Sequence, residues 1–217
     1  MGHRHRNRGR SSGCDVGERM IPLATQKSIY ASIPRYAHIP LTTDAKVAFA
    51  TLYDVGDQVR TGDQIYIADV QWAGTANISR MLKNRPIAVS VKISGDARDE
   101  SWSSPGMLDS ITPNGDISTV TRKQYRRATI SLSVYAVAIA TTSAEDIIDA
   151  YIEALQMWIM SDLRDTISVT GEGDVQDLSY LENTTARRDV IIYVRYPQTV
   201  TKTIDNIADI EVDVTAI

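Results

Sequence analysis

Hydrophobic and polar residues alternate with a period of two in four stretches of this chain. These are "PIAVSVKIS" at 86–94, "YRRATISLSVYAVAIAT" at 125–141, "RRDVIIYVRYP" at 187–197 and "IADIEVDV" at 207–214. Successive side chains of a β-strand point to opposite faces, so each stretch is expected to form a strand with one buried face. Pro197 is expected to end the third strand, because proline lacks the backbone donor that a sheet uses.

A helical period marks "TTSAEDIIDAYIEALQMWIMSDLRD" at 141–165. Ser143 is suited to cap the helix, and Glu145 and Asp146 favour the positive end of its dipole. The apolar residues recur every three or four positions as one stripe: Ile147, Ile148, Tyr151, Ile152, Leu155, Trp158, Ile159 and Leu163. The opposite side is polar, with Asp149, Glu153, Gln156 and Asp162. A helix with one apolar side needs a flat partner, so it is expected to pack on the sheet.

The order strand, strand, helix, strand, strand predicts an α+β fold, with a small antiparallel or mixed β-sheet packed by one main amphipathic helix. The polar segment 95–124 contains Gly, Pro and an Asn-Gly pair, so it is expected to be a long β-hairpin loop. In residues 135–139 the alternation ends, because the positions expected to be polar are also apolar. That loss predicts burial on both sides or a place at an interface.

Residues 1–45 are expected to form an extended N-terminal arm, and residues 46–217 a single α+β domain. Pro22, Pro34 and Pro40 disfavour long regular elements in the arm. Its apolar residues are scattered, which favours an arm laid over a neighbouring surface rather than a solvated tail. Further on, "KVAFATLY" and "QIYIADVQW" predict a hairpin or two short strands, and "GTANISRMLKN" predicts a short helix.

The composition narrows the class of protein. Hydrophobic residues make up 43% of 217 residues, which supports one ordinary core rather than a disordered chain. No apolar run approaches the roughly 20 residues that a membrane-spanning helix needs. The N-terminus also lacks the apolar segment of a secretory signal, so a soluble protein made in a cytoplasm is expected. Cys14 is the single cysteine, which leaves a free thiol or a disulfide to another subunit.

The sequence predicts no catalytic, cofactor-binding or metal-binding residue. His3 and His5 have no ligand-spaced partners, and neither a serine nucleophile elbow nor a phosphate-binding glycine loop is present. Carboxylates cluster in two polar stretches: Asp96, Asp99 and Glu100, and then Glu172, Asp174 and Asp177. Acid–base or magnesium chemistry is the alternative to solvated loops. The first cluster would also suit the lumen of a channel, because carboxylates repel passing DNA phosphates.

Charge is distributed unevenly, and this picks out candidate partner-binding residues. The net charge is −4; residues 1–20 hold five arginines against one Asp and one Glu, so they carry +3 and the remainder carries −7. The candidates are Arg4, Arg6, Arg8 and Arg10 in the arm, and Arg126, Arg127, Arg187 and Arg188 near strand starts. The arm suits nucleic-acid phosphates or an acidic protein patch. The strand arginines suit the acidic body of an adjacent copy.

The succession of elements from 86 to 217 resembles the neck and tail-terminator proteins of tailed bacteriophages. The resemblance runs through "PIAVSVKIS", the long polar loop, "QYRRATISLSVYA", "SAEDIIDAYIEALQ", "LENTTARRDVIIYVRYP" and "IDNIADIEVDV". Within it, Glu182, Arg187 or Arg188, Asp189 and Tyr193 follow the family's pattern of charged and aromatic residues before a strand. The first 70 residues depart from the family, which usually begins with a helix docked near the sheet.

The resemblance implies a structural virion protein, assembled in the host cytoplasm. It would form a ring, usually a hexamer, that ends the tail tube and joins it to the head connector, with DNA passing through the lumen. Its expected partners are its own copies, tail tube and sheath proteins, and connector proteins, with no membrane and no cofactor. The alternatives are another head-completion or tail component, a DNA-binding accessory protein that uses the arginine arm, and an enzyme that uses the carboxylate loops.

Overall fold

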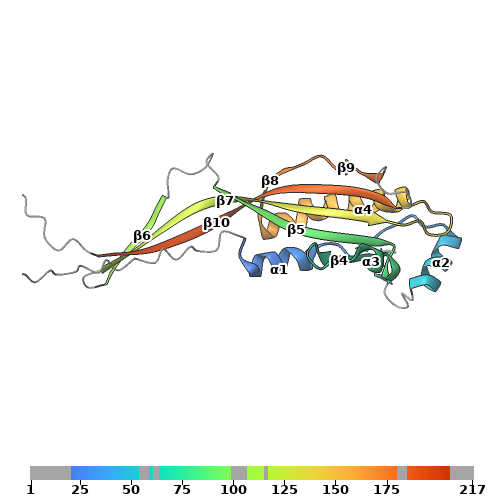
Figure 1. Cartoon of the computed structure of the whole chain (residues 1–217), viewed down its shortest axis with the longest axis horizontal. Coiled ribbons are helices and arrows are strands. Elements are labelled where there is room, and N and C mark those ends of the chain that lie inside the picture. The colour runs from blue at the N-terminus through green and yellow to red at the C-terminus, as the bar shows by residue number, and fades with distance from the viewer. Residues whose placement is uncertain are drawn as a thin grey trace, which may run out of the picture.

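The computed structural model describes residues 21–53, 59–60, 64–98, 107–114, 117–179 and 185–205. A head holds the helices, and a long β-ribbon projects from it (Figure 1). The helices are α1 (Leu23–Ser32), α2 (Thr43–Tyr53), α3 (Ile78–Asn84), α4 (Ala144–Trp158), the π-helical turn η1 (Ile159–Leu163) and α5 (Arg164–Thr166). The strands are β1 (Tyr36–Ala37), β2 (Val59–Arg60), β3 (Gln64–Tyr66), β4 (Ala68–Trp72), β5 (Ile87–Arg98), β6 (Met107–Asn114), β7 (Ile117–Ala136), β8 (Ser168–Glu172), β9 (Gln176–Asp177) and β10 (Ala186–Asp205).

The main sheet has the order β4-β5-β7-β10-β8, with β6 joined to β7 and β9 joined to β10. Strands β4 and β5 are parallel and the other pairs are antiparallel. The predicted α+β fold with a mixed sheet is therefore confirmed. A smaller sheet, β1-β3-β2, lies beside it in the head.

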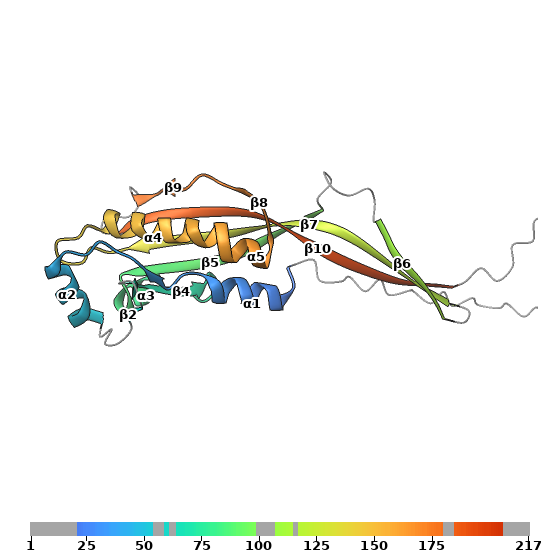
Figure 2. The ribbon, with the colours of Figure 1, turned by 180° about the vertical axis from the view of Figure 1, so that it is seen from behind.

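One face of the main sheet forms the core with α4 and α1, as Figure 2 shows from the helical side. Every residue of the predicted helical stripe is buried, and Ser143 caps α4 by accepting a hydrogen bond from the Asp146 backbone N–H. The sheet side of this core comes from alternate positions of three strands: Ile87, Val89, Val91, Ala128, Ile130, Leu132, Val134, Val190, Ile192 and Val194. The apolar face of the strands and the apolar stripe of the helix thus pack on each other, as the sequence predicts.

The other face of the sheet is covered only at one end, within the described part of the chain. There α3 packs on β5, and Met81 and Ala88 are fully buried outside the main core cluster. The rest of this face on β5, β7 and β10 is at least partly exposed, and we call it the open sheet face. Its residues are Ser90, Lys92, Ser94, Arg127, Thr129, Ser131, Ser133, Tyr135, Arg187, Asp189, Ile191, Tyr193 and Arg195.

The prediction that residues 1–45 lack long regular elements is wrong for residues 21–45. Helix α1 occupies ten of them, and Ile21, Ile29, Ile33, Ala37 and Ile39 lie in the same core as the sheet. Pro22 is compatible with this helix because it stands at the N-cap, before the positions that need an intrahelical donor. Residues 1–20 lie outside the described part.

The segment "KVAFATLY" is a helix rather than the predicted strand. It forms most of α2, which turns Ala45 and Phe49, four residues apart, into the core. The run "QIYIADVQW" is extended as predicted, but it divides into β3 and β4, which belong to different sheets. The predicted short helix in "GTANISRMLKN" is confirmed by α3, capped by Asn77. An eight-residue run of mixed polarity fits both the helical period and the strand period. Only the surface that it packs against therefore decides between helix and strand.

The predicted loop 95–124 contains strands. β5 continues to Arg98, β6 spans Met107–Asn114 and β7 begins at Ile117. Asn114 pairs with Ile117, so the Asn-Gly pair marks a tight hairpin rather than a long loop. Pro197 does not end its strand either: β10 continues to Asp205, and β8 pairs with β10 only as far as Arg195. Proline is tolerated where one side of a strand has no ladder partner.

The apolar end at 135–139 is not buried on both sides. β7 ends at Ala136; Tyr135 and Val137 are half-buried, Ala138 is exposed and Ile139 is buried. The alternative, a place at an interface, stays a prediction. The predicted strand at 207–214 lies outside the described residues. No helix in the described part is long and apolar enough to cross a membrane.

Candidate functional site

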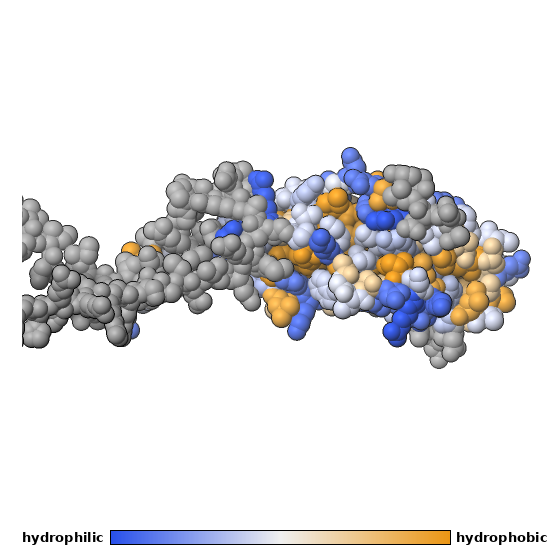
Figure 3. Space-filling view, viewed as in Figure 1, coloured by the Kyte–Doolittle hydropathy of each residue, from blue (hydrophilic) through white to orange (hydrophobic). Residues whose placement is uncertain are grey.

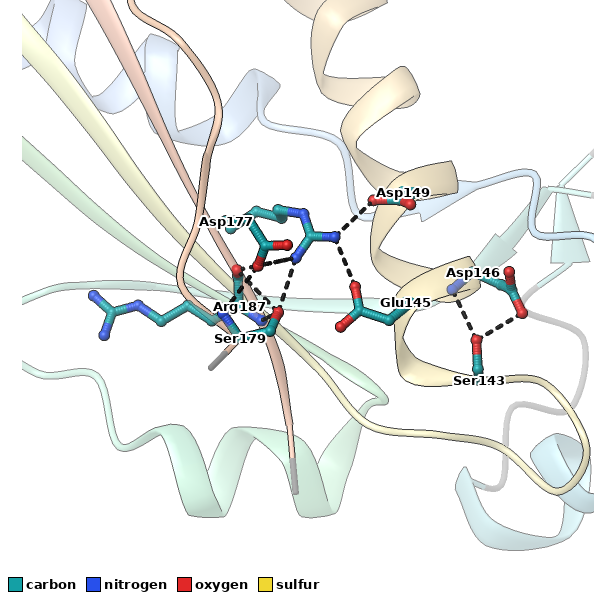
Figure 4. Close-up of polar contacts among 8 residues, drawn as sticks. Ser143, Glu145, Asp146, Asp149, Asp177, Ser179 and Arg187 are labelled. Atoms are coloured by element: carbon teal, nitrogen blue, oxygen red, sulfur yellow. Dashed lines mark hydrogen bonds and ion pairs between the residues drawn. The ribbon is translucent and has the colours of Figure 1, made fainter. Parts of the chain in front are cut away.

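Among the described residues, Arg188 at the start of β10 is the centre of a polar group that joins distant segments. Its Nη2 atom lies 2.6 Å from Glu145 Oε2 and 3.4 Å from Asp149 Oδ1. Its Nη1 atom lies 2.6 Å from Asp177 Oδ1 and donates to Ser179 Oγ at 2.8 Å. Figure 4 shows the four partners converging from α4 and from the segment around β9.

The local sequence explains this convergence. The Ser143 cap begins α4 so that Glu145 and Asp149, four residues apart, share one side of its first turns. Asp177 stands directly opposite Arg188 in the β9–β10 pairing. The Ser179 backbone N–H donates to the Asp177 carboxylate at 2.9 Å. This bond, more than the Arg188 charge, lowers the pKa of Asp177.

Arg188 therefore joins three segments of its own chain. Its side chain is only 12% exposed, while the three carboxylates are 50 to 65% exposed. Arg188 was predicted as a partner-binding residue from sequence; its described contacts are all within the chain. Arg187 points to the opposite face, where it pairs with Asp189 at 3.2 Å and lies over the Tyr135 ring at 5.1 Å.

The remaining candidate arginines are divided between the head and the undescribed arm. Arg126 donates from Nε to Gln198 Oε1 at 2.8 Å, between β7 and β10. Arg127 is exposed on the open sheet face, directly opposite Arg195. Arg4, Arg6, Arg8 and Arg10 lie outside the described residues.

The acidic loop predicted to face a lumen is only partly described. Asp96 lies in β5, where the pairing with β7 shifts between Ser94 and Ala97, so the backbone there is a strand rather than a loop. Asp99 and Glu100 lie outside the described residues. In the second cluster, Glu172 lies 3.8 Å from Arg164, and Asp177 belongs to the Arg188 group.

The ribbon is the second notable feature. Strands β7 and β10 pair over twenty residues each, from Ala136–Ala186 to Ile117–Asp205, a length of about 65 Å at the rise of an extended chain. The outer half of this pair continues past the end of β5 and β8 and is joined by β6 (Figure 1). Ile111 on β6 is 55% exposed there. The helices lie in the head (Figures 1 and 2), so the outer ribbon has no helix-backed core among the described elements.

No three of His, Cys, Asp and Glu among the described residues lie close enough to hold a metal ion. A shallow cavity of about 340 Å³ lies between α1 and α4, lined by Ser32, Arg35, Met157, Trp158 and Asp162. Burial raises the pKa of Tyr151. It also raises the pKa of Tyr53, which is less deeply buried. Both tyrosines therefore keep their hydroxyl protons at neutral pH, and the Tyr151 hydroxyl donates to the Pro34 carbonyl.

Sequence reasoning missed the open sheet face as a unit. Lys92 and Arg195, which the sequence did not single out, lie on the same face as Arg127 and Arg187. The polar positions that alternate with the apolar ones could have revealed this face. On the central strand, serine and threonine recur at the positions expected to face solvent.

No known protein-family model matches this chain, and a comparison with curated proteins finds no significant match.

Proposed function

We propose that this protein is a structural ring component of a phage neck, which ends the tail tube and connects it to the head. The observation that carries the proposal is the ribbon formed by β6, β7 and β10. An isolated β-ribbon in water is marginally stable, since too few side chains leave the solvent. A ribbon that projects from a packed head is suited to be completed by neighbouring molecules.

Two further features support an assembly. The open sheet face is a flat surface that no described element covers beyond α3. Exposed sheet faces and strand edges are commonly covered by identical neighbours in closed symmetric oligomers. The pattern of elements read from the sequence after residue 86, which resembles that of tail-terminator proteins, is the other support for the proposal.

The mechanism is one of position rather than chemistry. The packed head would form the ring wall by contact with adjacent copies. The ribbons would reach along the assembly axis to the tube or the connector. Binding at the end of the tube would cover the surface that the next tube subunit needs, and growth would stop.

The test is electron microscopy of the purified full chain, followed by growth of tail tubes from the phage that encodes it. Rings that bind tube ends and limit tube length support the proposal. A monomer at every concentration tested, or rings that leave tube length unchanged, would overturn it. A gel shift of DNA that disappears when residues 1–20 are deleted would instead favour the DNA-binding alternative.

The ribbon has its own test. Ile111→Asp places a charge on an exposed apolar ribbon position, and Thr112→Asp is the matched control at the exposed neighbouring position. We expect Ile111→Asp to abolish tube capping while the head keeps its thermal stability. Equal capping by both variants would remove the ribbon from the proposed mechanism.

A further inference from the structure

A cavity of about 350 Å³ lies on the helical side of the head, between the first turns of α4 and the segments 40–42 and 141–142. Its described lining holds three carboxylates, three hydroxyls and no cationic side chain; the polar residues are Asp146, Asp149, Glu153, Thr42, Thr141 and Thr142. Figure 2 shows this side, with the segment before α2 beside the start of α4. Figure 3 shows the opposite side, where hydrophilic and hydrophobic patches are interleaved over the sheet. The cavity therefore belongs to a different surface from the open sheet face.

The carboxylates follow one side of α4 on successive turns. Asp146, Asp149 and Glu153 are spaced by three and four residues, so the Cβ atoms of neighbours lie about 5 to 6 Å apart. Asp146 Oδ2 accepts a hydrogen bond from Ser143 Oγ at 2.6 Å, and Asp149 Oδ1 lies 3.4 Å from Arg188 Nη2 (Figure 4). Glu153 is exposed and makes no hydrogen bond or ion pair with the described residues. Each carboxylate therefore keeps an oxygen that no described donor uses.

A buried hydroxyl on the wall of this cavity also lacks a partner. Thr142 is only 5% exposed, and its Oγ1 atom has no hydrogen-bond partner among the described residues. Its backbone N–H and C=O are both paired with Ile139, at 2.9 and 3.0 Å. The hydroxyls of Thr42 and Thr141 lie 2.9 Å from each other. A buried hydroxyl without a partner costs free energy, so Thr142 points to a polar ligand in the same cavity as the carboxylates.

The class of ligand follows from these groups. Carboxylates favour a cation, but no three metal-ligating side chains of the described residues lie close enough to hold a metal ion. A row of carboxylates on successive helical turns instead suits several positive charges carried along one flexible chain. An ammonium group has three donors, enough for a carboxylate and a hydroxyl together.

We propose that this cavity binds a linear aliphatic polyamine. One ammonium group lies against Thr142, and the others lie along Asp146, Asp149 and Glu153. Pro40 and Ala150, which also line the cavity, give apolar surface to the methylene groups between the charges. The proposal goes beyond the neck function and does not depend on it.

The experiment is isothermal titration calorimetry of spermidine into the full chain at constant ionic strength, where we expect saturable binding. Glu153→Gln should weaken it about threefold or more, because the amine loses one exposed charge partner. Thr142→Val keeps the shape of the side chain without the hydroxyl and should weaken binding about tenfold. The same variant should leave the melting temperature of the unliganded protein unchanged or raised, because the hydroxyl has no described partner to lose. Asp165→Asn, at an exposed position of α5, is the matched control and should bind as wild type.

Butylamine, which carries a single ammonium group, distinguishes the two sources of an amine. If it binds as tightly as spermidine, the cavity takes one lysine-like side chain and the polyamine proposal is wrong. The proposal is also wrong if millimolar spermidine gives no binding heat, or if magnesium chloride at matched ionic strength gives the same heat. Thr142→Val that binds as wild type, or Asp165→Asn that weakens binding as much as Glu153→Gln, would likewise overturn it. None of these outcomes bears on the capping of tail tubes.

Discussion

The hydroxyl of Tyr151, in the middle of α4, donates a hydrogen bond to the backbone carbonyl of Pro34 at 2.6 Å, across 117 residues of sequence. Two turns further along, Trp158 Nε1 donates to Ser32 Oγ at 3.0 Å. These bonds attach the end of α1 and the segment that follows it to the main helix. They show why residues 21–41 belong to the head: α4 carries donors inside its apolar stripe, and the early segment supplies the acceptors.

Tyr151→Phe should lower the free energy of unfolding by about 1 to 3 kcal/mol, because the Pro34 carbonyl would lose its hydrogen-bond partner in a partly buried place. Urea denaturation followed by circular dichroism measures the change. Tyr193→Phe, at a 47% exposed position, is the control and should change stability by less than about 0.5 kcal/mol. Equal stability of both variants would show that the Tyr151 bond does not hold the segment.

Arg188→Met should destabilise the head by about 1 to 3 kcal/mol through the loss of charge-assisted hydrogen bonds to three carboxylates and Ser179. The cost stays below that of breaking a fully buried ion pair, because the carboxylates that remain are at least half exposed and become hydrated. Thermal denaturation of Arg188→Met and Arg188→Lys measures it. The lysine variant keeps the charge without the forked geometry and should fall between wild type and methionine. A lysine variant as unstable as methionine would contradict this explanation.

Asp177 should make stability depend on pH in the acid range. Its folded-state pKa lies below the ordinary value of 3.8, so its contribution is present above that value and is lost as the pH falls through the folded pKa. Wild type should therefore lose more stability than Asp177→Asn between pH 5 and pH 3. Urea unfolding at several pH values tests this, and parallel curves for the two proteins would exclude the role.

Gly173 and Gly171 provide a matched pair near β8. A Cβ atom on Gly173 would lie 3.1 Å from Ile191 Cβ and 3.3 Å from the Ile191 carbonyl oxygen, whereas one on Gly171 would meet only Tyr193 Cδ2 at 3.7 Å. Gly173→Ala should cost about 1 kcal/mol or more, since the backbone of β10 would have to move. Gly171→Ala should be close to neutral. Thermal shift measurements distinguish them, and equal stability of the two variants would contradict the close approach at Gly173.

Much of the head could be read from sequence because its elements carry strong local periods. The stripe from Ile147 to Leu163 and the alternation at Ile130, Leu132 and Val134 each specify one buried face, and burial of such a face is the largest favourable term available to the chain. The Ser143 cap followed in the same way, since the first N–H groups of a helix need an acceptor.

The tertiary structure alone decided the features that the local sequence leaves open. α2 became a helix because Phe49 and Ala45 find a core that the sequence could not show, and β10 runs through Pro197 because β8 ends before it. Arg188 looked like a surface charge until the fold brought Glu145, Asp149 and Asp177 around it from distant segments. The open sheet face has the same origin: residues on three strands share one surface only after strand order and register are set. Local periods depend on neighbours a few residues away, whereas these features depend on contacts between segments far apart in the chain.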